Sequence, residues 1–101
     1  MVQTMLSSAP VVVFSKTYCP YCKIAKDALQ KAVTDEYVKV YELDTMSEGS
    51  SIQAQLPALS GIKTVPQVFL NKEFIGDGST IAAMYKTGEL TEKLRKAGLL
   101  N

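Results

Sequence analysis

The feature that most constrains the fold is a short apolar run, Val11 to Phe14, followed within ten residues by an amphipathic segment. A run that is β-branched and apolar at every position is typical of a strand covered on both faces in a parallel sheet. Residues 37–43, YVKVYEL, are rich in valine and tyrosine and predict a second strand. Because both of its faces should be covered, we expect the first strand at the centre of the sheet. The strand–helix–strand unit should be right-handed, with its two strands parallel.

The segment between these strands predicts a helix packed on the sheet, because its apolar residues recur at helical spacing. The expected core positions of this helix are Ile24, Ala25, Ala28, Leu29 and Ala32.

The second half of the chain predicts a helix, a hairpin and two further helices. Residues 46–60 predict a helix with Ile52, Leu56 and Leu59 on one side and Gly61 at its end. Pro57 cannot donate a backbone hydrogen bond, so this helix should kink there, or end and restart. Residues 67–75, QVFLNKEFI, predict a β-hairpin that turns at Asn71-Lys72.

The last quarter of the chain predicts helices with a charged outer face. Ile81, Met84 and Tyr85 are expected in the core, and Glu89–Lys93 and Glu92–Lys96 have the spacing of i,i+4 ion pairs. The order β-α-β-α-β-β-α-α predicts one α/β domain over residues 1–101, built around a mixed sheet.

Composition excludes several classes of function. Eleven basic and ten acidic residues give a net charge of +1, with no basic run interleaved with aromatics, so we expect no nucleic-acid partner. The longest apolar run, APVVVF, is far shorter than a membrane span, and no basic segment opens the chain as in a targeting peptide. We therefore expect a soluble protein. We also expect a monomer, and a cytoplasmic location because a labile dithiol without an export signal suits a reducing compartment.

The two cysteines, Cys19 and Cys22, admit three explanations: a metal site, a structural staple or a redox pair. The chain has no histidine, so one copy cannot supply the four ligands of a structural zinc site, and we expect no metal. A disulfide across two residues would constrain the unfolded chain very little. A C-x-x-C pair inside a β-α-β pattern is typical of thioredoxin-like redox proteins.

The position of Cys19 favours chemistry at its sulfur. Pro20 suits the first turn of a helix, so unpaired backbone N–H groups should point at the Cys19 sulfur and stabilise a thiolate, with Lys16 adding positive charge. A stabilised thiolate is a good leaving group, so this site is suited to accepting a small thiol from a disulfide and passing it on. Cys22 should lie one turn further along, near enough to attack Cys19 but more shielded.

CPYC preceded by KTY resembles the motif of dithiol glutaredoxins and differs from the WCGPC of thioredoxins. The similarity continues through IQAQLPALSGIKTVPQVFLN and FIGDGST. It implies a thioredoxin fold with a four-stranded mixed sheet flanked by helices. It also implies glutathione as reductant, and glutathionylated or disulfide-containing proteins as substrates. Cys19 would attack the glutathione sulfur, and Cys22 would resolve protein disulfides.

The resemblance also implies a glutathione groove, in which the Val65–Pro66 bond is cis and faces the cysteines. From the residues alone, Lys16, Tyr21 and Gln53 could be surface side chains, and the segment from Asp77 could be only a helix cap. A helix N-terminus there also suits the γ-glutamyl carboxylate. The implied groove residues are Lys16, Tyr21, Gln53, Thr64, Val65, Pro66, Asp77, Gly78, Ser79 and Thr80.

The chain departs from the family pattern at three places that bear on glutathione affinity. Gly76-Asp77 replaces the usual Gly-Gly, Thr80 replaces a common aspartate, and Pro57 follows Gln53 by one turn. Two alternative functions remain open. One is a dimer holding a glutathione-ligated [2Fe-2S] cluster, which by resemblance Pro20 disfavours, and the other is a thioredoxin-like reductase served by a flavoprotein.

Overall fold

A four-stranded mixed sheet with the strand order β2-β1-β3-β4 organises the computed structural model, which describes residues 2–100. β1 (Val11–Ser15) pairs in parallel with β2 (Val38–Glu42) and antiparallel with β3 (Gln67–Leu70), which pairs with β4 (Glu73–Gly76). The parallel pairing and the central position of β1 confirm the predictions from the apolar run.

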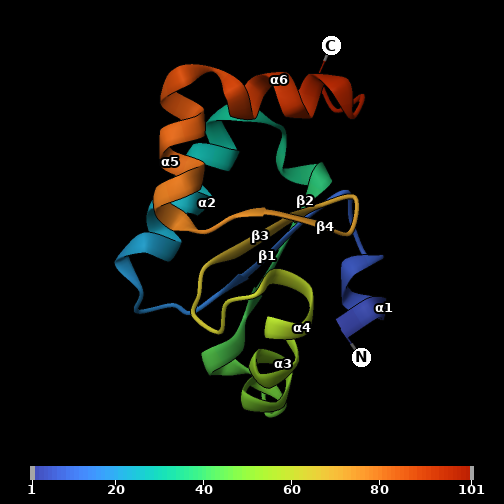
Figure 1. Cartoon of the computed structure of the whole chain (residues 1–101), viewed down its shortest axis with the longest axis vertical. Helices are drawn as coiled ribbons and strands as arrows, with labels where there is room; N and C mark the ends of the chain where they lie inside the picture. The colour runs from blue at the N-terminus through green and yellow to red at the C-terminus, as the bar shows by residue number, and fades with distance from the viewer. Residues whose placement is uncertain (1, 101) are drawn as a thin grey trace.

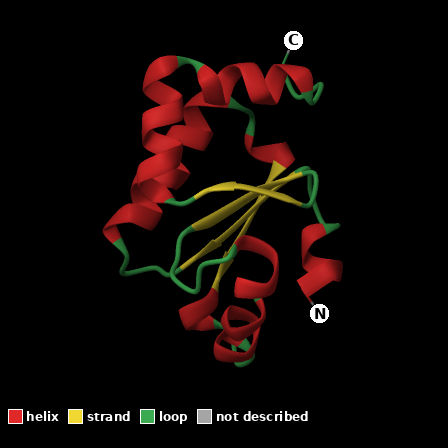
Figure 2. Ribbon diagram, viewed as in Figure 1, coloured by secondary structure: helices red, strands yellow, loops and turns green. Residues whose placement is uncertain are grey.

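Helices cover both faces of the sheet (Figure 1). Figure 2 shows the two helical layers with the strands between them. One layer contains α2 (Pro20–Ala32), α5 (Gly78–Thr87) and α6 (Glu89–Lys96). The other contains α1 (Val2–Leu6), α3 (Gly49–Gln55) and α4 (Pro57–Ser60), and two short 3₁₀ helices, η1 (Asp35–Tyr37) and η2 (Leu43–Thr45), flank β2. None of the helices within residues 2–100 is long and apolar enough to cross a membrane.

Alternate residues of β1 supply the two hydrophobic cores. Val11 and Val13 pack in the cluster with α2, α5 and α6, while Val12 and Phe14 pack in the cluster with α1 and α3. Period-two alternation puts successive side chains on opposite faces of a strand, so an uninterrupted apolar run is needed to fill both cores.

Helix α2 confirms the predicted helix but not all of its predicted core. Pro20 occupies its first turn, and Ala25, Ala28 and Leu29 are buried. Ile24 is 42% exposed, so its predicted core position is wrong. It lies two residues from the buried Cys22, and a two-residue step places side chains on opposite sides of a helix.

Two other predicted core residues are also exposed. Tyr85 of α5 and Leu59 of α4 lie at the surface, whereas Ile81, Met84, Ile52 and Leu56 are buried as predicted. Tyr85 follows the buried Met84 on α5, where the spacing pattern does not say which neighbour faces the core. Leu59 lies on α4, a single turn in which no residue is buried.

The helix predicted over residues 46–60 is two helices. α3 ends at Gln55 and α4 starts at Pro57, which confirms the alternative in which the helix ends and restarts. α3 begins only at Gly49, because η2 precedes it, and a Cβ at Gly49 would lie 1.8 Å from the carbonyl oxygen of Leu43. Only glycine allows α3 to approach η2 so closely.

The hairpin and the C-terminal helices form where they were predicted. Asn71 and Lys72 both have positive φ, 49° and 71°, as a two-residue type I′ turn requires. On α6, Glu92 pairs with Arg95 rather than with Lys96, so the predicted i,i+4 pair is replaced by an i,i+3 pair. Helix α1 was not predicted, although its buried residues follow i, i+3, i+4 spacing.

Candidate active site

The two cysteines lie where β1 ends and α2 begins, and both are free thiols. Cys19 is the N-cap of α2, with extended backbone angles, and its Sγ accepts a hydrogen bond from the backbone N–H of Cys22 at 3.3 Å. The structure therefore places the Cys19 sulfur at the end of the helix where unpaired N–H groups stabilise a negative charge.

Cys22 is buried, with no exposed surface, whereas Cys19 is only partly buried. Burial, together with hydrogen bonding to Cys19, raises the pKa of Cys22 to about 11. The backbone N–H of Lys16, 3.4 Å from Cys22 Sγ, and the nearby Ser15 hydroxyl act in the opposite direction. At neutral pH Cys22 is a protonated thiol, so Cys19 is the sulfur that is open to an incoming disulfide.

The Val65–Pro66 peptide bond is cis, as the family resemblance implied, and it faces the cysteines. The Cys19 thiol donates to the Val65 carbonyl oxygen across 3.9 Å. Within residues 2–100, no hydrogen bond uses the backbone N–H of Val65. This peptide unit can therefore pair with an extended ligand lying beside Cys19.

Gly78 brings the start of α5 against the start of α2. A Cβ at Gly78 would lie 2.8 Å from both the Cβ and the carbonyl oxygen of Tyr21, and 3.1 Å from Pro66. A side chain at this position would force α5, α2 and the cis-proline segment apart.

A pocket of about 310 Å³ lies between these segments. It is lined by seven residues of the predicted groove: Tyr21, Thr64, Val65, Pro66, Asp77, Gly78 and Ser79. The structure thus brings together residues from three separate parts of the sequence, in a volume suited to a small peptide-like ligand.

Asp77 caps α5 at the edge of this pocket. Its Oδ1 accepts a hydrogen bond from the backbone N–H of Thr80 at 2.9 Å, and this bond is the main reason that the pKa of Asp77 is lowered. Thr80, also predicted in the groove, is not among the residues that line the pocket, and its side chain lies next to Gly76. Both the cap and the pocket that the sequence suggested for this segment are present.

Lys16 and Gln53 do not line the pocket, although both were predicted in the groove. Gln53 donates from Nε2 to the carbonyl oxygen of Lys63 at 2.8 Å, so it fixes the loop that leads to Thr64. The pKa of Asp44 is lowered, chiefly by the Thr17 hydroxyl and in smaller part by the charge of Lys16. Lys16 therefore acts on the carboxylate of Asp44 through its charge, and it reaches Cys22 through its backbone N–H.

Two residues that hold the site together were not predicted from the sequence. Gln67 is fully buried and donates from Nε2 to the carbonyl oxygens of Ile62 and Thr64, both at 2.9 Å, which fixes the segment before the cis-proline. Thr17 hydrogen-bonds Asp44 through its backbone and side chain. The sequence signal that could have identified Gln67 is a polar glutamine at the start of an otherwise apolar strand.

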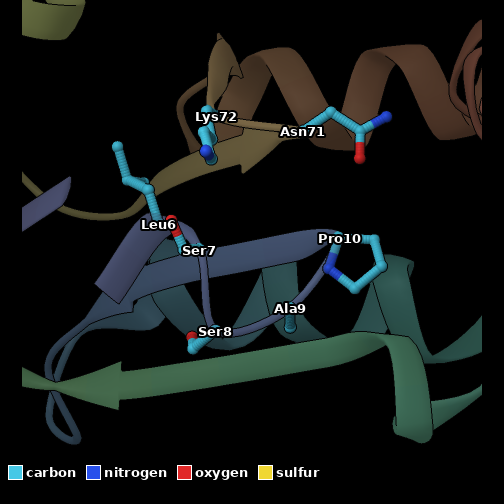
Figure 3. A pocket seen from close by; sticks show the side chains of 7 residues that line it. All are labelled: Leu6, Ser7, Ser8, Ala9, Pro10, Asn71 and Lys72. Atoms are coloured by element: carbon cyan, nitrogen blue, oxygen red, sulfur yellow. The ribbon is translucent and has the colours of Figure 1, made fainter. Parts of the chain in front are cut away.

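A larger pocket, about 600 Å³, lies at the opposite end of β1 (Figure 3). The segment from Leu6 to Pro10 lines one side of it, and Asn71 and Lys72 of the hairpin turn line the other. It contains neither cysteine and one charged residue, Lys72, so it is not the site of the thiol chemistry. Within the described residues, no group of three or more histidine, cysteine, aspartate or glutamate side chains could hold a metal ion.

A mixed sheet flanked by helices, a C-x-x-C pair at a helix start and a cis-proline facing it define a thiol-disulfide oxidoreductase with the thioredoxin fold. The glutaredoxin family model matches residues 11–75. A glutaredoxin of Ricinus communis is 46% identical over 94 residues, covering 93% of this chain and 90% of that protein.

Solved structures agree with the sequence comparison. Oxidised glutaredoxin 2 of Chlamydomonas reinhardtii superposes with a TM-score of 0.89 at 39% identity, covering 98% of this chain and 92% of that one. A buckwheat glutaredoxin–glutathione complex superposes with a TM-score of 0.86 at 35% identity, covering 99% and 89%. The chain belongs to the glutaredoxin family, as its motifs indicated.

Proposed function

We propose that this protein uses glutathione to reduce protein–glutathione mixed disulfides and protein disulfides. The observation that carries the proposal is the pocket beside Cys19, which offers ligand-binding groups on two sides. The structural similarity to a glutaredoxin–glutathione complex supports the same ligand.

Two of the three residues of glutathione, the γ-glutamyl and the cysteinyl residue, have a counterpart in the pocket. The backbone of Val65, with its free N–H, suits the cysteinyl peptide unit, which would lie like one more strand beside the cis-proline. The N-terminus of α5, at Gly78 and Ser79, suits the γ-glutamyl carboxylate because its N–H groups point outward. The Asp77 carboxylate is engaged by Thr80, and it stands near the place where the ligand's amine would lie.

The exchange conserves electrons at every step. The Cys19 thiolate attacks the glutathione sulfur of the substrate, a Cys19–glutathione disulfide forms, and the protein thiol leaves with a proton. A second glutathione then attacks this disulfide, releasing oxidised glutathione and reduced Cys19. On a protein disulfide, Cys22 attacks Cys19 instead, and the resulting Cys19–Cys22 disulfide is reduced by two glutathiones.

The deciding experiment is glutathione-driven reduction of a glutathionylated protein. We expect turnover with glutathione, and we expect Cys22→Ser to retain deglutathionylation while losing the reduction of protein disulfides. Turnover that ignored glutathione and required a flavoprotein reductase would contradict the proposal. Anaerobic incubation with iron and sulfide tests the cluster alternative, because a coloured dimer would support that role.

The oligomeric state and the cellular location are also part of the proposal. A labile dithiol suits a reducing compartment, which supports action in the cytoplasm. Sedimentation of the reduced protein with glutathione should give a monomer, and fractionation of cells should find the chain with cytoplasmic proteins.

A further inference from the structure

Two polar residues lie behind Cys22, at the carboxyl ends of the parallel strands. Ser15 is the last residue of β1 and Glu42 is the last residue of β2, and they are direct partners in the parallel ladder. Partners in a ladder point to the same face of the sheet. Ser15 shares its face with Val11 and Val13, which pack under α2.

Helix α2 confirms that Glu42 points to this face. Lys26, one turn after Cys22 on α2, bonds Glu42 Oε2 at 2.7 Å, and both side chains are about three-quarters buried. Cys22, Lys26, Ser15 and Glu42 therefore occupy one buried space between α2 and the sheet. We call Ser15 and Glu42 the rear pair.

Each member of the rear pair has a buried oxygen without a hydrogen-bond partner. Within residues 2–100, these atoms are Ser15 Oγ and Glu42 Oε1. A buried oxygen without a partner costs roughly 1–3 kcal/mol, so its presence calls for an explanation. A third such atom, Gln67 Oε1, belongs to a residue paired with Phe14, whose side chain packs in the core on the other face.

The resolving step needs a group that removes the proton of Cys22. With a pKa of about 11, roughly one Cys22 in ten thousand is ionised at neutral pH. Only the thiolate attacks a disulfide. The Ser15 hydroxyl is close enough to lower the pKa of Cys22, although in the reduced protein it is not aligned in a hydrogen bond.

We propose that Ser15 and Glu42 accept the proton of Cys22 during the resolving step. In the reduced protein neither oxygen is hydrogen-bonded, so the Ser15 hydroxyl must turn towards Cys22 and Glu42 Oε1 once the mixed disulfide has formed. Ser15 then accepts the thiol proton and passes its own hydroxyl proton to Glu42 Oε1, because a hydroxyl both donates and accepts. The Cys22 thiolate attacks Cys19 Sγ, the Cys19–Cys22 disulfide forms, and the substrate sulfur leaves as a thiolate that takes a proton from solvent. In this step Ser15 is the group that meets the thiol, and Glu42, held by Lys26, acts through Ser15.

The other charged groups around Cys22 are placed differently. Lys16 reaches the Cys22 sulfur through its backbone, and Cys19 is the partner in the disulfide. Asp44 accepts hydrogen bonds from Thr17, and Asp77, across the pocket on α5, accepts one from Thr80. Among these carboxylates, Glu42 is the one with a buried oxygen still free to take a proton.

This inference rests on the dithiol part of the proposed function but does not depend on glutathione. The test therefore uses an aromatic disulfide, dithionitrobenzoate, that releases a coloured thiol. Mixing it with the reduced protein should release one thiol when Cys19 attacks and a second when Cys22 closes the disulfide. Rapid mixing separates the two phases.

We expect Ser15→Ala to slow the second phase at least tenfold relative to the first, since positioned acid–base groups contribute factors of this size or larger. Ser15→Thr keeps the hydroxyl and should restore the second phase. Ser15→Ala removes an oxygen that has no hydrogen-bond partner, so the melting temperature of the variant should not fall. A lower melting temperature would show that the change also affects the structure.

Glu42→Gln should also slow the second phase at least tenfold and change its pH profile, whereas the exposed Glu73→Gln on β4 should match the parent protein. A second phase that stays within twofold in Ser15→Ala would overturn the inference. So would slowing in Ser15→Ala without slowing in folded Glu42→Gln. If the parent protein released only one thiol, the dithiol function itself would fail.

Discussion

Helices α2 and α5 start on two sides of one pocket. A sulfur caps the first turn of α2 and a carboxylate caps that of α5, and each accepts the N–H of the residue three positions later. In α2 the Cys19 sulfur accepts the N–H of the third following residue at 3.3 Å. In α5 the Asp77 carboxylate does the same at 2.9 Å. Each cap therefore satisfies a backbone group that a helix start leaves unpaired.

The difference between the caps shows how one geometry serves two purposes. A carboxylate is a strong acceptor that is charged at neutral pH and stabilises its helix without exchanging covalent partners. A sulfur is a weaker acceptor, but it can exchange covalent partners while the N–H groups stabilise its anion. Gly78 keeps the two helix starts in contact, so the reactive cap and the unreactive cap lie close to the same pocket.

Replacing the reactive cap by an unreactive one should have the largest effect. Cys19→Ser keeps a cap of the preferred type, so α2 should remain intact and the melting temperature should not fall. Its rate of deglutathionylation should drop at least about a thousandfold, because a hydroxyl cannot form the mixed disulfide. Thermal melting and turnover of the purified variant check both parts. Loss of folding would contradict the assigned cap.

The buried thiol of Cys22, three residues after the Cys19 cap, should make the stability of the protein depend on pH in the alkaline range. Thr80, at the same position after the Asp77 cap, has no group that titrates there. Below pH 9.0, the ordinary pKa of a cysteine, the folded and unfolded chains both keep the Cys22 proton. Between pH 9.0 and about 11 only the folded chain keeps it, so the free energy of unfolding should fall, by about 2–3 kcal/mol in total.

Denaturant titrations of the fully reduced protein across this range measure that slope. Cys22→Ser is the matched control, since it lacks the titrating thiol while retaining every lysine and tyrosine. Identical slopes in the two proteins would show that burial does not hold the Cys22 proton.

Gly78→Ala should separate the two helix starts. The added methyl would overlap the backbone of Tyr21, which cannot yield as a flexible side chain can. We expect a loss of about 1–3 kcal/mol in stability and a KM for the glutathionylated substrate raised about tenfold. Gly88→Ala is not a suitable control because its φ is 88°, so Ala83→Gly on α5 serves to measure a change in helix propensity alone. An unchanged KM would show that the contact is not needed for binding.

Removing the unreactive cap should have the smallest effect. Asp77→Ala should cost about 1 kcal/mol, and Asp77→Asn, which keeps an acceptor, should cost less. Because its hydrogen bond lowers the pKa of Asp77, the stability it adds is present above the unfolded pKa and is lost as the pH falls through the folded pKa. The melting temperatures of the parent protein and Asp77→Ala should therefore differ at neutral pH and converge as the pH becomes acidic.

The sequence predicted most of the fold because its signals are local. The break at Pro57 follows from one missing N–H, and the turn at Asn71-Lys72 follows from residues that tolerate positive φ. The thiol pair was likewise readable, because Pro20 and the spacing of the cysteines place Cys19 at a helix start.

The sequence patterns do not show how separate segments meet. Gln53 and Lys16 stay predicted ligand contacts: Gln53 holds the loop at Lys63, and neither residue lines the pocket beside the cis-proline. Ile24 has the spacing of a core residue but faces solvent, because the buried stripe of α2 follows Cys22. No periodicity within one segment records which neighbour will cover it.

By itself, the sequence determined the order of strands and helices, the central strand and the reactive sulfur at a helix start, since each depends on steric or hydrogen-bonding preferences of adjacent residues. The tertiary structure alone decided that Gly78 touches Tyr21, that Cys22 is fully buried and that Ser15 and Glu42 lie together behind it. These facts depend on how the sheet aligns distant segments, and burial changes the proton affinity of a thiol only after that alignment exists.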